Sequence, residues 1–141
     1  MIATETIRSL MHALPVVLSP TQTLSHALFL FEENDFRHLP VVEEGRVVGM
    51  LSEADLKRYD GFVTSSFDAF MRRRRLDHGQ IRSAMTTPVY CINADAPLSL
   101  AIELMLEYRI HALPVLEAGV LTGIVTDTDL LTFFHHQLTD L

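Results

Sequence analysis

The sequence predicts an α/β fold in which one structural unit is used twice. The heptapeptide Gly49–Asp55 (GMLSEAD) recurs 74 residues later as Gly123–Asp129 (GIVTDTD). Around each copy, the apolar residues switch between the spacing of a helix and that of a strand. A repeat of this length is too long for a solenoid unit and too short for two ordinary independent domains. We therefore expect two halves that pack on each other as one module with pseudo-twofold symmetry.

The same offset of 74 residues relates many other positions of the two copies. The pairs are Ile7-Arg8-Ser9 with Ile81-Arg82-Ser83, Leu24-Ser25 with Leu98-Ser99, Leu39-Pro40-Val41 with Leu113-Pro114-Val115, and Gly45 with Gly119. The register wavers only near Pro15 and Pro88, which are 73 residues apart. We expect a first repeat over residues 1–66, a basic helical linker over 67–80 and a second repeat over 81–141.

Each repeat is expected to follow the order strand, helix, strand, strand, helix, after a short helical lead-in. In the first repeat Val16–Leu18 is an apolar strand. The next helix carries an apolar stripe, which is repeated in the second copy: Leu24, Ala27, Leu28 and Phe31, then Leu98, Ala101, Ile102 and Met105. Two strands then surround the turn Glu43-Glu44-Gly45, matched by Glu117-Ala118-Gly119, before helices begin at Ser52 and Thr126.

The composition is that of a compact soluble protein and argues against several classes. The chain has 141 residues, 48% of them hydrophobic, and a net charge of −7, which repels nucleic acid. No apolar run approaches the roughly 20 residues of a membrane-spanning helix, and no signal peptide is evident, so we expect a cytoplasmic protein without membrane contact. The lone Cys91 excludes an intrachain disulfide and is expected to be a buried thiol.

The doubled patterns Ser52-x-x-Asp55 and Thr126-x-x-Asp129 have two interpretations. A hydroxyl followed three residues later by an acid is a helix capping box, which contributes on the order of 1 kcal/mol. Alternatively, the pattern binds a nucleotide. The glycine upstream would let a ligand approach the backbone, the helix N-terminus would offer free amides to an anion, and the carboxylate would accept hydrogen bonds from ribose hydroxyls. Two such sites facing each other would line one cleft.

Taken together, these motifs resemble a pair of cystathionine-β-synthase-type (CBS) domains, the Bateman module. The resemblance rests on Arg37–Val41, His111–Val115 and the two heptapeptides, and it covers nearly all of the chain. It implies that each repeat contributes a small three-stranded sheet with two helices. It also implies a non-catalytic sensor of AMP, ADP or ATP, with S-adenosylmethionine as a further possibility.

The resemblance assigns roles to particular residues. Ser52 and Thr126 would touch phosphate or ribose, and Asp55 and Asp129 would hold the ribose hydroxyls. The adenine would lie between the segment that enters the first strand and the strand before the helix. The remaining candidate site residues are Ala13, Leu14, Val16, Thr86, Thr87, Val89, Met50, Ile124, His38, Pro40, His111, Pro114 and Arg109.

The two half-sites are not expected to be equal. Family members that bind nucleotides often carry a basic residue five positions before the proline of the second strand, and this residue is Arg109 in the second repeat but Asp35 in the first. A carboxylate repels phosphate, so we expect the Thr126–Asp129 half-site to bind more strongly. Arg37 and His38 alternate along a strand, so one of them at most faces the ligand. For His111, ligand contact and simple packing remain open alternatives.

The linker contains the run Arg72–Arg75, the only concentrated positive charge in the sequence. One interpretation is a solvated helix with Phe67, Phe70 and Met71 packed beneath it at spacing i, i+3, i+4. The other is a phosphate clamp or docking patch, because four consecutive arginines reach all faces of a helix.

Catalytic and metal-binding classes are not favoured by the sequence. The seven histidines never pair at the i, i+4 spacing of a helical zinc site, and no nucleophile elbow, P-loop or cysteine pair occurs. Two hypotheses remain: a sensor of an adenosyl ligand that reports to an unknown regulated protein, or a ligand-free scaffold for dimerisation or docking. We expect a homodimer, with Phe62, Leu56, Leu130 and Phe133 at the interface.

Overall fold

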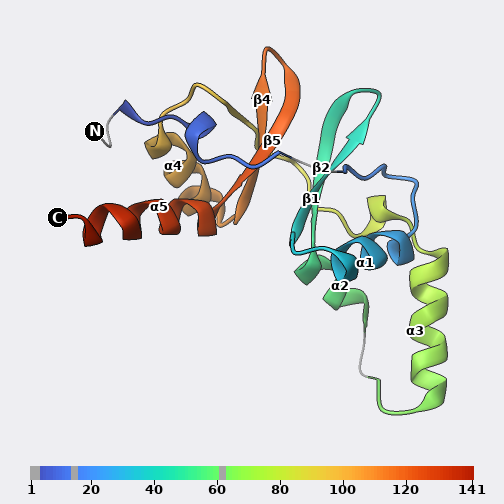
Figure 1. Ribbon diagram of the computed structural model, residues 1–141. Helices are drawn as coiled ribbons and strands as arrows, with labels where there is room; N and C mark the ends of the chain where they lie inside the picture. Colours follow the sequence, from blue (N-terminus) through green and yellow to red (C-terminus); the bar gives the residue numbers. More distant parts are fainter. Residues whose placement is uncertain (1–3, 14–15, 61–62) are drawn as a thin grey trace. The chain divides into compact units, whose positions relative to one another are not determined.

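The computed structural model describes residues 4–13, 16–60 and 63–141, which form two compact units (Figure 1). Unit 1 comprises Met1–Pro15 with Tyr90–Leu141, and unit 2 comprises Val16–Val89. Each unit thus joins the body of one repeat to the short lead-in that precedes the other repeat in sequence. The packing units therefore cut across the sequence repeats, because the two lead-ins are exchanged.

Unit 2 consists of a β-hairpin and three helices that contact one another. Its elements are α1 (Leu24–Glu33), β1 (His38–Glu43), β2 (Arg46–Ser52), α2 (Glu53–Asp60), α3 (Ser66–His78) and the 3-10 helix η3 (Ile81–Ser83). Strands β1 and β2 are antiparallel, and α1 packs on both α2 and α3 (Figure 1). The lead-in of the second repeat, η3, belongs to this unit: Ile81 is fully buried and its amide donates to Gln22 O at 2.9 Å.

Unit 1 has the same plan with a three-stranded sheet. Its elements are the 3-10 helix η2 (Ile7–Ser9), β3 (Ile92–Asn93), α4 (Leu98–Tyr108), β4 (Ala112–Glu117), β5 (Val120–Thr126) and α5 (Asp127–Thr139). The sheet order is β3-β4-β5. Strand β4 pairs in parallel with β3 and in antiparallel with β5. Ile7 of the lead-in is fully buried in this core beside Leu113, Val115 and Val125.

The strand expected at Val16–Leu18 is reduced to a single bridge in unit 2. Leu18 N–H donates to Pro40 O at 2.9 Å and Leu18 O accepts from Val42 N–H at 2.7 Å, in the parallel sense. The pairing stops there because the chain turns towards α1, where Gln22 N–H donates back to Ser19 O. Unit 1 shows the fuller version of this edge in β3.

The local signals in the sequence are confirmed. The apolar stripes bury Leu24, Ala27 and Phe31 in α1 and Leu98, Ala101 and Met105 in α4. Both hairpin turns have two successive residues with positive φ, Glu44 (52°) and Gly45 (77°), then Ala118 (50°) and Gly119 (80°). Two positive φ values match the right-handed twist of the flanking strands. None of the helices in the described ranges is long and apolar enough to cross a bilayer.

The linker is helical, as expected, but the face of the helix that is buried differs from the expected one. Phe67 and Phe70 are 69% and 57% exposed, and the buried residue of α3 is Leu76 instead. Arg74 lies over the Phe70 ring, 5.9 Å from its centroid. The prediction that these phenylalanines pack beneath the helix is therefore wrong: i, i+3 spacing places them on one face but does not say which face meets the core.

The interface residues expected for a homodimer also need correction. Leu56 and Leu130 are 2% and 5% exposed within their own units, so they have little surface to offer a partner. Phe133 packs against the core of unit 1, and Phe62 lies outside the described residues. The exposed apolar residues of α5 are instead Leu131 and Leu138, at 70% and 68%.

Candidate functional site

Both repeated heptapeptides form capping boxes. In unit 1, Asp129 N–H donates to Thr126 Oγ1 at 3.2 Å and Thr126 N–H donates to Asp129 Oδ2 at 2.8 Å. In unit 2, the corresponding distances are 3.0 Å from Asp55 N–H to Ser52 Oγ and 2.9 Å from Ser52 N–H to Asp55 Oδ2. The capping interpretation is therefore realised in both units, which leaves the outer carboxylate oxygen, Oδ1, to make other contacts.

The amides at the start of α5 are not free, contrary to the expectation that this helix end offers them to an anion. Asp127 N–H donates to His111 O at 2.9 Å, Thr128 N–H to Asp127 Oδ1 at 2.8 Å, and Asp129 N–H to the capping hydroxyl. In unit 2, Glu53 N–H donates to Arg37 O at 2.9 Å in the same way. A phosphate at these positions would have to rely on side chains.

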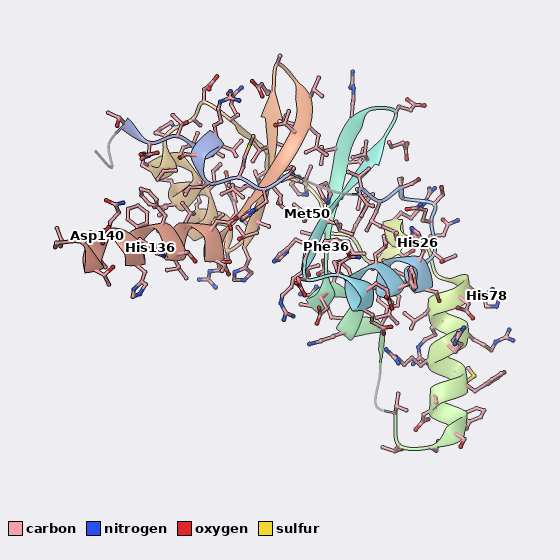
Figure 2. All side chains as sticks on the ribbon, viewed as in Figure 1. His26, Phe36, Met50, His78, His136 and Asp140 are labelled. Carbon is pink, nitrogen blue, oxygen red and sulfur yellow. The ribbon has the colours of Figure 1, made fainter. Side chains whose placement is uncertain are left out.

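The glycine of each heptapeptide is required by the protein's own lead-in. A Cβ on Gly123 would lie 2.5 Å from His12 O, and one on Gly49 would lie 2.7 Å from Met85 Sδ and 3.2 Å from Thr86 O. At these points the lead-in pairs with the strand: His12 with Ile124, and Thr86 with Met50 (Figure 2 labels Met50 on β2). The close approach inferred from glycine is thus real, but the approaching groups belong to the same chain: backbone of His12 at Gly123, and the Met85 side chain with the Thr86 carbonyl at Gly49.

His12 is a residue that the sequence reasoning missed. Its Nε2 lies 2.5 Å from Asp129 Oδ1, the oxygen that the capping box leaves over. The Asp129 side chain is 12% exposed, whereas that of His12 is 68% exposed. The offset of 74 aligns His12 with Thr86. Each of them lies against the glycine of a heptapeptide, Gly123 or Gly49, so a glycine that permits close approach was the sequence signal for both residues.

A second pair of charged contacts flanks each heptapeptide. His111 Nδ1 lies 2.8 Å from Asp127 Oδ2, and the equivalent Arg37 Nη1 lies 3.3 Å from Glu53 Oε2. His111 is thus an exposed residue in a hydrogen bond rather than a packed one. Both acids follow the capping hydroxyl directly, and neither was among the predicted site residues. Asp55 Oδ1 has a further partner, Arg58 Nη1, at 3.5 Å.

The structure divides the predicted site residues between the units. Unit 1 brings Ala13 next to the bridge between His12 and Ile124, whereas Thr86 and Thr87 lie with Met50 in unit 2. Val16 and Val89 are partly buried in unit 2, and His38 is the first residue of β1. Leu14 lies outside the described residues.

Three predicted residues have a clear structural environment. Pro40 and Pro114 are buried within their hairpins, so they shape the strands and present no surface to a ligand. Arg109 is exposed at the C-cap of α4, with φ of 54° and ψ of 47°. It stands three residues before Ala112, which pairs with Thr126, so its side chain starts close to the heptapeptide of unit 1.

A groove of about 680 Å³ on unit 2 borders the Ser52–Asp55 half-site, because Asp35, Arg37 and Glu53 are among its lining residues. The other walls come from α1, α2 and α3. Ser52 and Asp55 themselves do not line it. Arg37 and Lys57 in this groove both contact Glu53, at 3.3 and 3.7 Å.

The described residues were also searched for side chains that could hold a metal ion. Within those ranges no three His, Cys, Asp or Glu side chains are close enough together to hold a metal ion. Partial burial raises the pKa of the Cys91 thiol, which lowers the fraction of thiolate and makes a nucleophilic role less favourable.

With this geometry in view, comparison with known proteins identifies the family. The CBS domain model matches residues 7–61 and again residues 80–136, so the chain belongs to the CBS domain family and carries two copies. The resemblance predicted from the motifs and the tandem α/β fold are confirmed. Helix α3 lies wholly between the two matched segments.

Individual relatives show how far the likeness extends. CBS domain-containing protein YhcV of Bacillus subtilis is 30% identical over 115 residues, which cover 80% of this chain and 74% of YhcV. MJ1225 of Methanocaldococcus jannaschii is 30% identical over 122 residues, or 84% of this chain and 43% of MJ1225. Its crystal structure has a TM-score of 0.75 and 27% identity over 94% of this chain and 48% of that chain. This chain thus spans less than half of MJ1225.

One similar structure contains a nucleotide. The crystal structure of CBSX2 in complex with AMP has a TM-score of 0.73 and 27% identity, covering 93% of this chain and 97% of that chain. CBS domain pairs similar to this chain therefore include one that binds an adenine nucleotide.

Proposed function

We propose that this chain is a non-catalytic regulatory module that binds an adenine nucleotide, AMP, ADP or ATP, or a related adenosyl compound such as S-adenosylmethionine. The binding groups would be the two half-sites built on the heptapeptides, with Thr126 and Asp129 in unit 1 and Ser52 and Asp55 in unit 2. AMP in the structure of CBSX2 supports this choice of ligand class.

The main support for the proposal is that each capping box does not use all the hydrogen-bonding capacity of its hydroxyl and its carboxylate. An ionised carboxylate has about four lone-pair positions. Asp129 Oδ2 accepts from Thr126 N–H, so the paired hydroxyls of a ribose would be accepted chiefly at Oδ1, the oxygen that also contacts His12. The Thr126 hydroxyl accepts from Asp129 N–H and still has its own proton to donate.

Phosphate recognition would fall to side chains, because the first amides of α5 are already used. Arg109 is an exposed cation three residues before Ala112, the residue that pairs with Thr126, which supports the expectation that unit 1 holds the phosphorylated end more firmly. Asp35 occupies the equivalent position in unit 2 and would repel phosphate.

The test is isothermal titration calorimetry with AMP, ADP, ATP, adenosine and S-adenosylmethionine. We expect Asp129→Asn to fold normally, since an amide oxygen can still accept from Thr126 N–H, and to weaken nucleotide binding by about 1.5–3 kcal/mol, the range for a hydrogen bond to a charged group. His135→Ala, an exposed histidine on the same helix, is the matched control and should bind like the wild type.

Unchanged affinity in a folded Asp129→Asn protein would remove Asp129 from the site. If none of the five compounds binds at millimolar concentration, the result favours the second candidate function. This is a ligand-free scaffold, which forms a homodimer or docks a regulated partner. The exposed Leu131 and Leu138 on α5 and Phe67 and Phe70 on α3 favour that alternative. Light scattering would then be expected to give twice the monomer mass of 15.9 kDa.

A further inference from the structure

The hydrogen bond between His12 and Asp129, called the latch below, joins two segments that are 117 residues apart. Because an ionised carboxylate only accepts hydrogen bonds, Nε2 of His12 carries the donated proton. The bond occupies Oδ1, the oxygen of Asp129 that the capping box does not use. The latch therefore connects the lead-in directly to the carboxylate proposed to hold the ribose.

The main chain of His12 is fixed, but its side chain has room to move. His12 N–H donates to Ile124 O and His12 O accepts from Ile124 N–H, both at 2.9 Å, and the His12 carbonyl lies against Gly123. Arg8 anchors the same lead-in through Asp95 and Glu117, each at 2.9 Å. By contrast, the imidazole side chain is 68% exposed, so it can rotate into solvent, and the segment then loses one of the contacts that hold it against unit 1.

Unit 2 keeps the backbone arrangement but connects its carboxylate differently. Thr86 occupies the place of His12 and exchanges backbone hydrogen bonds with Met50 at 2.8 and 3.2 Å. The outer oxygen of Asp55 faces Arg58, three residues further along the same helix. This contact stays within α2, so it does not link the carboxylate of unit 2 to the lead-in.

We propose that His12 is a positioning residue that competes with the ligand: a ribose diol takes Asp129 Oδ1 from His12, so that binding at unit 1 opens the latch and loosens the lead-in. Binding at unit 2 leaves its lead-in unaffected. This inference rests on the proposed function and adds a route from the ligand to Thr6–Ala13, the segment that completes the unit 1 core through Ile7.

The latch can be tested first without any ligand. We expect amide hydrogen exchange at His12 and Met11 to be several-fold faster in His12→Ala than in the wild type. The side-chain amide of Gln can donate to Asp129, so His12→Gln should restore slow exchange, and His135→Ala should match the wild type. Exchange that is unaltered in His12→Ala would overturn the latch.

The competition is tested with AMP as the probe. All variants carry Asp55→Asn, which weakens the half-site of unit 2, so that the measured affinity is that of unit 1. Removing the competing donor should make AMP bind on the order of tenfold more tightly in His12→Ala, whereas His12→Gln should stay near the wild type. In wild-type protein, AMP should also shift the His12 imidazole resonances and accelerate exchange of the lead-in amides. The resonance shift separates displacement of the ring from a general change in stability.

The outcomes separate the latch from the proposed function. AMP binding that is unchanged in His12→Ala overturns the competition, and weaker binding would make His12 a ligand contact instead, which also overturns it. If AMP and adenosine bind none of the proteins, including His12→Ala, the proposed function fails and the ligand-driven opening fails with it. In that case, the ligand-free exchange measurement still decides whether the latch exists.

Discussion

Units 1 and 2 repeat one backbone plan, yet they satisfy the acids of the repeated heptapeptide with different cations. In unit 1 the partners are imidazoles, His12 on Asp129 and His111 on Asp127. In unit 2 they are guanidiniums, Arg58 on Asp55 and Arg37 on Glu53, and Glu53 also contacts the Lys57 ammonium. A guanidinium is a permanent cation, whereas an imidazole can be neutral or charged. Both acids of unit 2 therefore face a guanidinium, whereas both acids of unit 1 face an imidazole ring.

This difference separates the features of the repeat that the backbone conformation requires from those that it does not. The glycine, the capping hydroxyl with its acid, and the positive φ values of the hairpin turn are the same in both units, because each serves the backbone: the close approach of the lead-in, the start of the helix and the tight turn. The partners that differ are exposed: the side chains of His12, Arg37 and Arg58 are 68%, 72% and 78% exposed. Exposed positions can diverge at little expense in packing, and that is where the half-sites have become unlike.

The largest expected effect comes from adding one methyl group at the two equivalent glycines. In Gly123→Ala the new Cβ meets a backbone carbonyl at 2.5 Å, which cannot move without breaking the pairing of His12 with Ile124. In Gly49→Ala the closest atom is the flexible Met85 Sδ, although Thr86 O lies at 3.2 Å. We expect Gly123→Ala to lower the free energy of unfolding by about 2–3 kcal/mol and Gly49→Ala by about 1 kcal/mol.

Urea unfolding followed by circular dichroism measures both losses, and hydrogen exchange assigns each one to its unit. Met85→Ala combined with Gly49→Ala is the control, because it removes the nearest obstacle and should relieve part of the strain in unit 2. Equal losses at the two glycines would show that the lead-ins are equally rigid, and the proposed contrast between backbone and side-chain obstacles would be wrong.

Most of the fold could be predicted because its signals are local and appear twice. The stripe Leu24–Phe31, the turn at Gly45 and the cap at Ser52 each depend on residues a few positions apart, and a second copy at the same offset removes coincidence. The exchange of the lead-ins could not be predicted this way. Apolar periodicity shows that Ile7 is buried, but it does not say which repeat buries it.

The half-sites were predicted less completely for the same reason. Ser52, Asp55, Thr126 and Asp129 were found through their spacing, whereas the partner of Asp129 lies 117 residues away, on a segment with no periodicity of its own. The claim that the start of α5 offers free amides was wrong because it treated the helix end in isolation. The carbonyl of His111 and the side chain of Asp127 reach those amides only in the folded unit.

A smaller effect is expected from the two capping hydroxyls, which should be equivalent. Both boxes have nearly the same distances, so Thr126→Ala and Ser52→Ala should each lower the free energy of unfolding by about 1 kcal/mol. Thr126→Ser keeps an acceptor for the Asp129 amide and should change stability little. Thermal unfolding is the measurement. A loss at Thr126 that is several times the loss at Ser52 would mean that the latch and the cap are energetically coupled in unit 1.

The smallest expected effect concerns a feature that unit 2 has alone, the contact of α3 with α1. The Ser25 hydroxyl donates to Asp77, and Arg73 Nε lies 3.3 Å from the same carboxylate. The hydrogen bond from Ser25, helped by the charge of Arg73, holds the pKa of Asp77 below its ordinary value of about 3.9. The folded state therefore favours the ionised form.

It follows that the contribution of Asp77 to stability is present above about pH 4 and is lost as the pH falls through the lowered pKa. We expect the wild type to unfold at a higher urea concentration than Asp77→Asn at pH 6, with the difference vanishing near pH 2. The effect should be small, because the Asp77 side chain is 43% exposed and solvent screens its charge. Ser25→Ala removes the largest cause and should move the loss towards higher pH. A difference between wild type and Asp77→Asn that persists at pH 2, where the carboxylate is protonated, would show that Asp77 stabilises the contact of α3 with α1 by something other than its charge.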